Sequence, residues 1–139
     1  TTKRRTLRCG LEKRRRICGL ATMCSRLELL DRETWQDFLS STAAVLILGK
    51  SDCESCAAWT SEVKSFLRDD VEWTNVRFGK IDLDLGGLAS FKKANTWLAD
   101  VTDLPLTIVY VDGDRKKEFL GSGIQRLIKR MRRVINLPH

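Results

Sequence analysis

The sequence has one histidine, no second cysteine pair at short spacing and no long apolar run. His139 is the only histidine among 139 residues. A structural zinc site usually takes a second pair of ligands, commonly cysteines or histidines at short spacing, so the sequence predicts no metal centre. A membrane-spanning helix needs an apolar run of about 18 residues. No run here approaches that length, and we expect no membrane span.

Cysteine is too sparse, and odd in number, for a disulfide-rich secreted scaffold. The chain has five cysteines, whereas such scaffolds carry an even number at high density. A reducing compartment fits this usage best, so we expect a cytoplasmic protein. Cys9, Cys18 and Cys24 show no spacing typical of metal ligands.

The net charge of +7 is concentrated at the start of the chain. Residues 1–22 hold eight basic residues and one acid, while bases and acids balance in the remainder. Like charges without a hydrophobic period indicate a solvated arm. We therefore predict a basic, flexible arm over residues 1–24 and a single domain over residues 25–139. The arm either contacts an anionic partner such as nucleic acid or has no function, and we favour the second.

The segment Cys53-Glu54-Ser55-Cys56 carries the clearest chemical signal. An apolar run over residues 43–48 precedes it, and a helical pattern over residues 56–67 follows it. Cys-x-x-Cys at the junction of a buried strand and a helix is typical of a redox centre. The spacing spans about one helical turn, which brings the sulfurs within bonding reach. The unpaired N–H groups of the helix N-terminus stabilise a thiolate on the first cysteine.

This geometry gives the two sulfurs different tasks. We expect Cys53 to be the exposed nucleophile and Cys56 the inner thiol that resolves the mixed disulfide. Two alternatives remain open: half of a zinc site, or two thiols without a task. The redox interpretation fits the position of the pair better than either.

The hydrophobic pattern predicts an α/β domain with five strands and four helices. Strands are expected near residues 27–30, 43–48, 76–83, 105–111 and 115–120, and helices near residues 31–39, 56–67, 88–98 and 124–135. Asp31 is a candidate N-cap for the first helix. Asp112-Gly113 is a strong hairpin signal. The bases of the last helix indicate a solvated face rather than a nucleic-acid site.

In this order the motifs resemble a thioredoxin-fold protein over about residues 26–136. Three features accompany Cys-x-x-Cys: Lys-x-Asp-x-Asp at residues 80–84, Pro-x-Thr at residues 105–107, and a hairpin followed by an amphipathic helix. The resemblance implies a central mixed sheet flanked by helices. It also implies that Pro105 is cis and faces the cysteines, with Leu104 and Pro105 holding an extended substrate segment. An ordinary trans loop proline is the alternative.

The cysteine loop departs from the usual thioredoxin signature, which has Trp before the first cysteine and Gly-Pro between the pair. Here Asp52 and Glu54-Ser55 occupy those positions, and the buried acid that assists proton transfer in thioredoxins falls at Ile47. Negative charge beside Cys53 disfavours its thiolate. We therefore expect the pair to act as a reductant or exchange partner rather than as a strong oxidant.

Two further residues have supporting roles in this hypothesis. Without an internal acid, Cys56 must lose its proton to water, to neutral Lys80 or to a surface carboxylate. Lys80 is otherwise a solvated residue at a strand end. Trp59 lies one turn beyond Ser55 and either packs near the site or only fills the core.

The sequence thus predicts a thiol–disulfide oxidoreductase that exchanges with protein disulfides and dithiols. No bound cofactor is needed, because electrons come from another protein or a small thiol. We expect a monomer and no nucleic-acid partner. The main alternative is a thioredoxin-fold binding or adaptor module with weak exchange, which the charged loop and the missing acid would explain.

Overall fold

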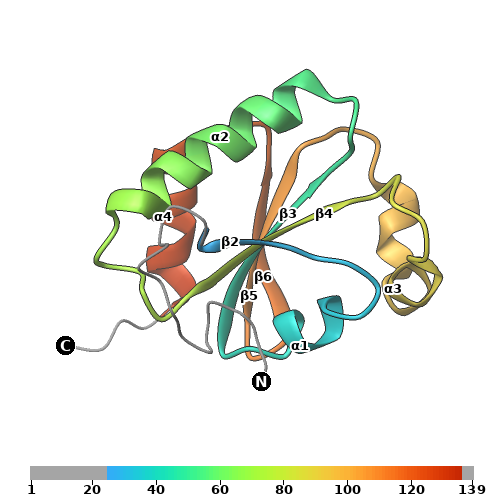
Figure 1. The fold of residues 1–139 in the computed structure, drawn as a ribbon. Coiled ribbons are helices and arrows are strands. Elements are labelled where there is room, and N and C mark those ends of the chain that lie inside the picture. The colour runs from blue at the N-terminus through green and yellow to red at the C-terminus, as the bar shows by residue number, and fades with distance from the viewer. Residues whose placement is uncertain (1–24, 136–139) are drawn as a thin grey trace.

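The computed structural model describes residues 25–135, and their elements follow the predicted order (Figure 1). The predicted arm over residues 1–24, with Cys9, Cys18 and Cys24, lies outside the described residues. The strands are β2 (Leu27–Leu29), β3 (Ala43–Gly49), β4 (Arg77–Asp82), β5 (Leu106–Val111) and β6 (Asp114–Leu120). The helices are α1 (Trp35–Leu39), α2 (Glu54–Asp69), α3 (Ala89–Ala94), the 3-10 helix η2 (Thr96–Asp100) and α4 (Ile124–Val134).

The strands form one mixed sheet in the order β2-β4-β3-β5-β6. The strands β2, β4 and β3 are parallel, while β5 and β6 are antiparallel to their neighbours. At the centre, β3 is buried along its whole length, as its continuous apolar sequence predicts for a strand covered on both faces. The predicted α/β fold with a mixed sheet is confirmed.

Helices cover both faces of the sheet (Figure 1). Successive side chains of a strand point to opposite faces, so β3 contributes to two separate cores. Val45 and Ile47 pack in the core under α2 and α4. Leu46 and Leu48 pack in the core with α1, α3 and η2. Among the helices of residues 25–135, none has the length and apolar character to cross a membrane.

Two predicted details are wrong. The single helix expected over residues 88–98 is α3 followed by η2, because Asn95 leaves the helical region at φ −128° and ψ 68°. Its side-chain amide donates to the carbonyl of Phe91 at 2.8 Å, a local bond that competes with helix continuation. Asp31 caps the turn before α1, accepting from the N–H of Glu33 and Thr34, while the N-cap of α1 itself is Thr34.

The hairpin and the last helix agree with the sequence pattern. Asp112 and Gly113 have φ of 53° and 85°, both positive as a type I′ turn requires. The apolar side of α4 is buried through Leu127 and Met131. Its bases are not all merely solvated, since the guanidinium groups of Arg126 and Arg130 lie 4.6 and 4.9 Å from the ring centre of Phe119.

Candidate active site

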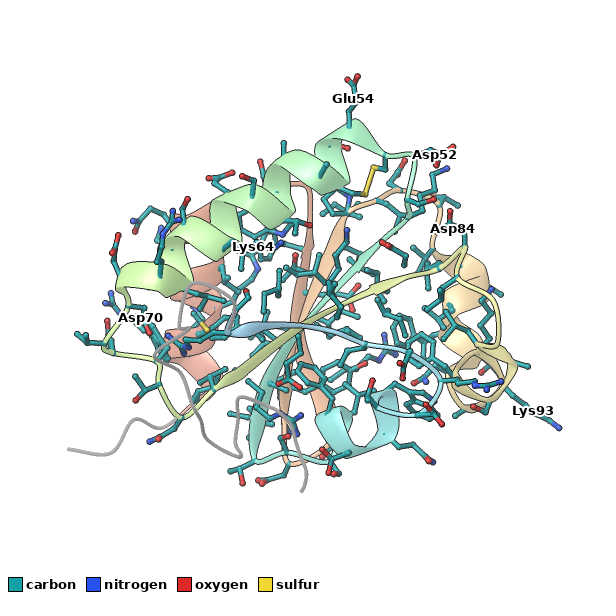
Figure 2. The ribbon with its side chains drawn as sticks, in the orientation of Figure 1. Asp52, Glu54, Lys64, Asp70, Asp84 and Lys93 are labelled. Carbon is teal, nitrogen blue, oxygen red and sulfur yellow. A yellow bond between two sulfur atoms is a disulfide. The ribbon has the colours of Figure 1, made fainter. Side chains whose placement is uncertain are left out.

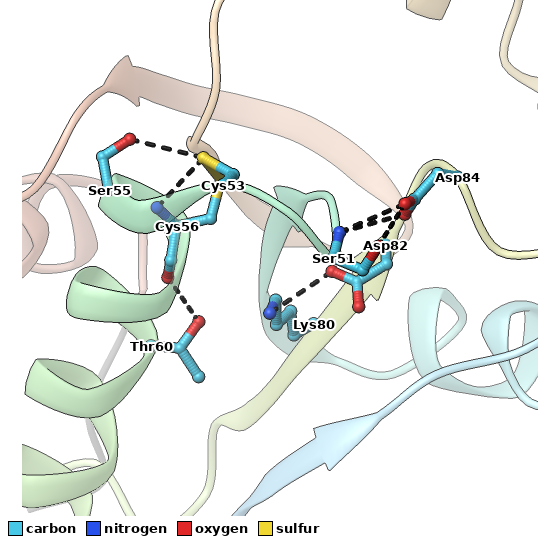
Figure 3. Close-up of a disulfide and its surroundings, with 8 residues drawn as sticks. All are labelled: Ser51, Cys53, Ser55, Cys56, Thr60, Lys80, Asp82 and Asp84. Atoms are coloured by element: carbon cyan, nitrogen blue, oxygen red, sulfur yellow. Dashed lines mark hydrogen bonds and ion pairs between the residues drawn. A yellow bond between two sulfur atoms is a disulfide. The ribbon is translucent and has the colours of Figure 1, made fainter.

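The cysteine pair lies between the end of β3 and the first turn of α2 (Figure 3). Cys53 is the N-cap of α2, and its Sγ accepts a hydrogen bond from the N–H of Cys56 at 3.2 Å. The two residues form a disulfide, with their Cα atoms 5.2 Å apart. Cys56 is fully buried, whereas Cys53 is partly exposed. Of the two residues, Cys53 is therefore the one that a second protein can reach.

Polar and acidic residues surround Cys53. The hydroxyl of Ser55 lies 3.3 Å from Cys53 Sγ. Asp52 and Glu54 are exposed, and Figure 2 shows both side chains at the outer edge of the disulfide loop. The helix N-terminus stabilises negative charge on the sulfur, while the two carboxylates oppose it. The helix N-terminus and the two carboxylates therefore have opposite effects on the stability of a thiolate at Cys53 Sγ.

The carboxylate of Asp84, two residues after the end of β4, holds the loop before the cysteines. The N–H of Ser51 donates to Asp84 Oδ1 at 3.1 Å, and its hydroxyl donates a short hydrogen bond to Asp84 Oδ2. The hydrogen bond from the Ser51 hydroxyl, and to a smaller extent the bond from its N–H, lowers the pKa of Asp84 from its ordinary value. The sequence pattern does not indicate this contact, although Asp84 is the last residue of the Lys-x-Asp-x-Asp motif.

The predicted substrate-binding residues lie at the same end of the sheet. The register pairs Leu48 of β3 with Leu106 of β5, which places Leu104 and Pro105 beside the loop that follows β3. The Leu104–Pro105 peptide bond is cis, as the resemblance implies. Pro105 is buried, and its carbonyl accepts from the N–H of Gly121 at 2.9 Å, while Leu104 is half-buried.

The two supporting residues are both buried or nearly so. The Lys80 side chain is 13% exposed and its Nζ lies 3.3 Å from Asp82 Oδ1, so the solvated alternative for Lys80 is wrong. Trp59 is fully buried in the core under α2, as its core-filling alternative predicts. Its indole N–H donates to the hydroxyl of Thr107 at 2.8 Å, a partner that the sequence pattern did not indicate.

A metal would need further ligands near the cysteines. Within residues 25–135, no group of three or more histidine, cysteine or acidic side chains is arranged to hold one. The zinc alternative therefore finds no support in the part of the chain that the structure describes.

The fold matches those of solved thioredoxins, while neither a model of a known protein family nor a curated protein sequence matches the chain. Thioredoxin f2 of Chlamydomonas reinhardtii is 22% identical with a TM-score of 0.61, over 77% of this chain and 94% of its own. Thioredoxin O2 of Arabidopsis thaliana, in its oxidized state, is 20% identical with a TM-score of 0.62, over 81% and 96%. The thioredoxin of Malassezia sympodialis is 12% identical with a TM-score of 0.63, over 78% and 90%. The chain has the thioredoxin fold.

Proposed function

We propose that the protein is a thiol–disulfide oxidoreductase that acts on protein disulfides. The observation that supports this best is the disulfide at the start of α2, which joins a buried Cys56 to a partly exposed Cys53. An inert structural disulfide has no need of an exposed sulfur capped by helix N–H groups. A nucleophile needs both.

The exchange proceeds in two displacements. In the reduced protein the Cys53 thiolate attacks one sulfur of a substrate disulfide, and the other substrate sulfur leaves with the electron pair. Cys56 then attacks Cys53 Sγ, the mixed disulfide breaks and the second substrate sulfur leaves. The substrate gains two electrons, and the Cys53–Cys56 disulfide forms. A protein or small-thiol donor reduces this disulfide for the next cycle.

Leu104 and Pro105 position the substrate in this proposal. An extended segment of the substrate pairs with the backbone of Leu104 as a short added strand. The adjacent cysteine loop then meets the substrate disulfide from one side. Backbone pairing does not depend on the side chains of the substrate, so the choice among substrate proteins must come from other surfaces of this protein.

Compartment and partners follow from the same chemistry. The cycle must return to the dithiol form, which a reducing compartment such as the cytoplasm maintains. We propose that the protein works there as a monomer, with protein disulfides as substrates and no bound cofactor.

A binding or adaptor module with weak exchange is the second candidate. The carboxylates of Asp52 and Glu54 disfavour the Cys53 thiolate. Ile47 is fully buried at the position where thioredoxins have an internal acid. Both features slow exchange without removing the substrate-binding surface.

Insulin reduction by dithiothreitol distinguishes the two candidates. The wild-type protein should accelerate insulin precipitation, and Cys53→Ser should abolish the acceleration. In a separate reaction, Cys56→Ser that is first reduced and then mixed with insulin without dithiothreitol should accumulate a mixed disulfide, because the resolving sulfur is missing and no free thiol replaces it. A folded wild-type protein that gives no acceleration would exclude the oxidoreductase and leave the adaptor.

A further inference from the structure

A lysine and a carboxylate, Lys80 and Asp82, lie near the end of β4, beside the end of β3 that leads into the cysteine loop. Along β4, Phe78 belongs to the core covered by α2 and α4, and Lys80 and Asp82 follow it on the same face at a spacing of two. The parallel register sets Ile47 beside Lys80 and Gly49 beside Asp82. The apolar rows of both strands therefore end at a polar pair, at the edge of the sheet where the cysteines lie.

The space between Lys80 and Cys56 is left open by a glycine. A methyl group built on Gly49 would lie 3.3 Å from Cys56 Sγ and 3.3 Å from Lys80 Cε. The inner sulfur and the lysine side chain thus flank the same point. The ammonium of Lys80 is directed at Asp82, with Nζ 3.3 Å from Asp82 Oδ1 (Figure 3).

Asp82 has spare capacity to accept a proton. Its side chain is 34% exposed, but the Oδ1 atom is buried and forms no hydrogen bond within residues 25–135. The Lys80 ammonium at 3.3 Å is an ion-pair contact. A buried carboxylate oxygen normally finds a hydrogen-bond partner, so this oxygen can take a proton without breaking an existing hydrogen bond.

We propose that Asp82, through Lys80, receives the proton of Cys56 when Cys56 resolves the mixed disulfide. The inference rests on the proposed function. Lys80 gives one ammonium proton to Asp82 and takes the thiol proton of Cys56, so Lys80 is unchanged at the end. The Cys56 thiolate then bonds to Cys53 Sγ, and the bond from Cys53 to the substrate sulfur breaks. The electron pair leaves with the substrate sulfur, and the proton remains on Asp82 until water removes it.

The other polar groups around the cysteines are less suited to this step. Asp52 and Glu54 are exposed on the outer side of the loop. The carboxylate of Asp84 is occupied by Ser51. From α2 itself, the hydroxyl of Thr60 donates to the backbone carbonyl of Cys56 at 2.8 Å and is occupied there.

The two displacements can be separated by stopped-flow mixing of the reduced protein with 5,5′-dithiobis(2-nitrobenzoate). Cys9, Cys18 and Cys24 are replaced by serine in every variant, so that only Cys53 and Cys56 react. The attack of Cys53 releases the first coloured thiolate, and resolution by Cys56 releases the second. The coloured thiolate is a good leaving group, so the second phase reports on the thiol of Cys56.

Asp82→Asn should slow the second phase about 100-fold near neutral pH, the size typical of one proton-transfer group, and leave the first phase unchanged. In Asp82→Asn the rate of the second phase should rise toward the wild-type rate at higher pH, because hydroxide then removes the proton of the Cys56 thiol. Lys80→Met should slow the same phase, and Asp82→Glu should restore most of the wild-type rate. Asp69→Asn, an exposed acid at the far end of α2, is the matched control and should change neither phase.

A second phase with the same rate and pH profile in wild type, Asp82→Asn and Lys80→Met would overturn the inference. A wild-type protein that forms no mixed disulfide would overturn the proposed function instead. The two failures are therefore distinguishable in one experiment.

Discussion

The hydrogen bond between Trp59 and Thr107 joins the two halves of the candidate site. Trp59 lies one turn after Cys56 on α2, and Thr107 lies two residues after Pro105 on β5. The indole N–H donates to the Thr107 hydroxyl at 2.8 Å, and both side chains are buried. We predict that this bond contributes measurably to the stability of the domain.

The loss of unfolding free energy in each variant depends on which buried group remains without its hydrogen-bond partner. Thr107→Val keeps the shape of the side chain and leaves the indole N–H buried without its partner, which costs about 1–3 kcal/mol. Trp59→Phe leaves the Thr107 hydroxyl without its donor and also opens a cavity, so it should cost more. The double variant loses the bond only once, and should be about 1–2 kcal/mol more stable than the sum of the single losses predicts.

Urea unfolding of the four proteins, followed by circular dichroism, measures this coupling. A control cycle combines Trp59→Phe with Phe91→Leu, because Phe91 packs in the core on the opposite face of the sheet. The control should be additive to within about 0.5 kcal/mol. If the Trp59 and Thr107 losses also add to within about 0.5 kcal/mol, the hydrogen bond makes no net contribution to stability.

Three further predictions concern single residues. Gly79→Ala places a methyl carbon 2.8 Å from the buried ring of Phe38, so urea unfolding should show a loss of about 1–3 kcal/mol; an unchanged midpoint would contradict this. Burial raises the pKa of Tyr110 to about 12. The folded protein then holds the phenol neutral while the unfolded chain ionises, and wild type should lose about 2–3 kcal/mol relative to Tyr110→Phe between about pH 10 and 12; parallel pH curves would exclude it. The hydrogen bonds from Ser51, mainly that from its hydroxyl, lower the pKa of Asp84. The contact therefore stabilises the folded protein at neutral pH, and this stabilisation is lost as acid protonates the carboxylate. An NMR titration should find Asp84 below its ordinary pKa, and Ser51→Ala should return it toward that value; no change would count against the contact.

Much of the fold could be predicted because its signals are local. The apolar run that forms β3 and the Asp112-Gly113 turn act over a few residues, and both behave in the structure as their patterns predict. The position of Cys53 at the N-terminus of α2 follows in the same way.

The remaining features depend on residues that are distant in the sequence. The Lys80 side chain is only 13% exposed, and it lies beside the space that Gly49 leaves next to Cys56. Neither Gly49 nor Cys56 is near Lys80 in the sequence. The Trp59–Thr107 bond spans 48 positions. The helix break at Asn95 has a local cause, the bond from its side-chain amide to the carbonyl of Phe91, but the helical period of the apolar residues around it points to a continuous helix.

The midpoint potential of the Cys53–Cys56 couple is the decisive measurement of whether this protein exchanges dithiols and disulfides. We expect a reversible two-electron couple between about −200 and −300 mV, near the value typical of thioredoxin, because Asp52 and Glu54 disfavour the thiolate that a strong oxidant stabilises. A pair that does not cycle between dithiol and disulfide, or a midpoint near −120 mV as in strongly oxidising relatives, would contradict it.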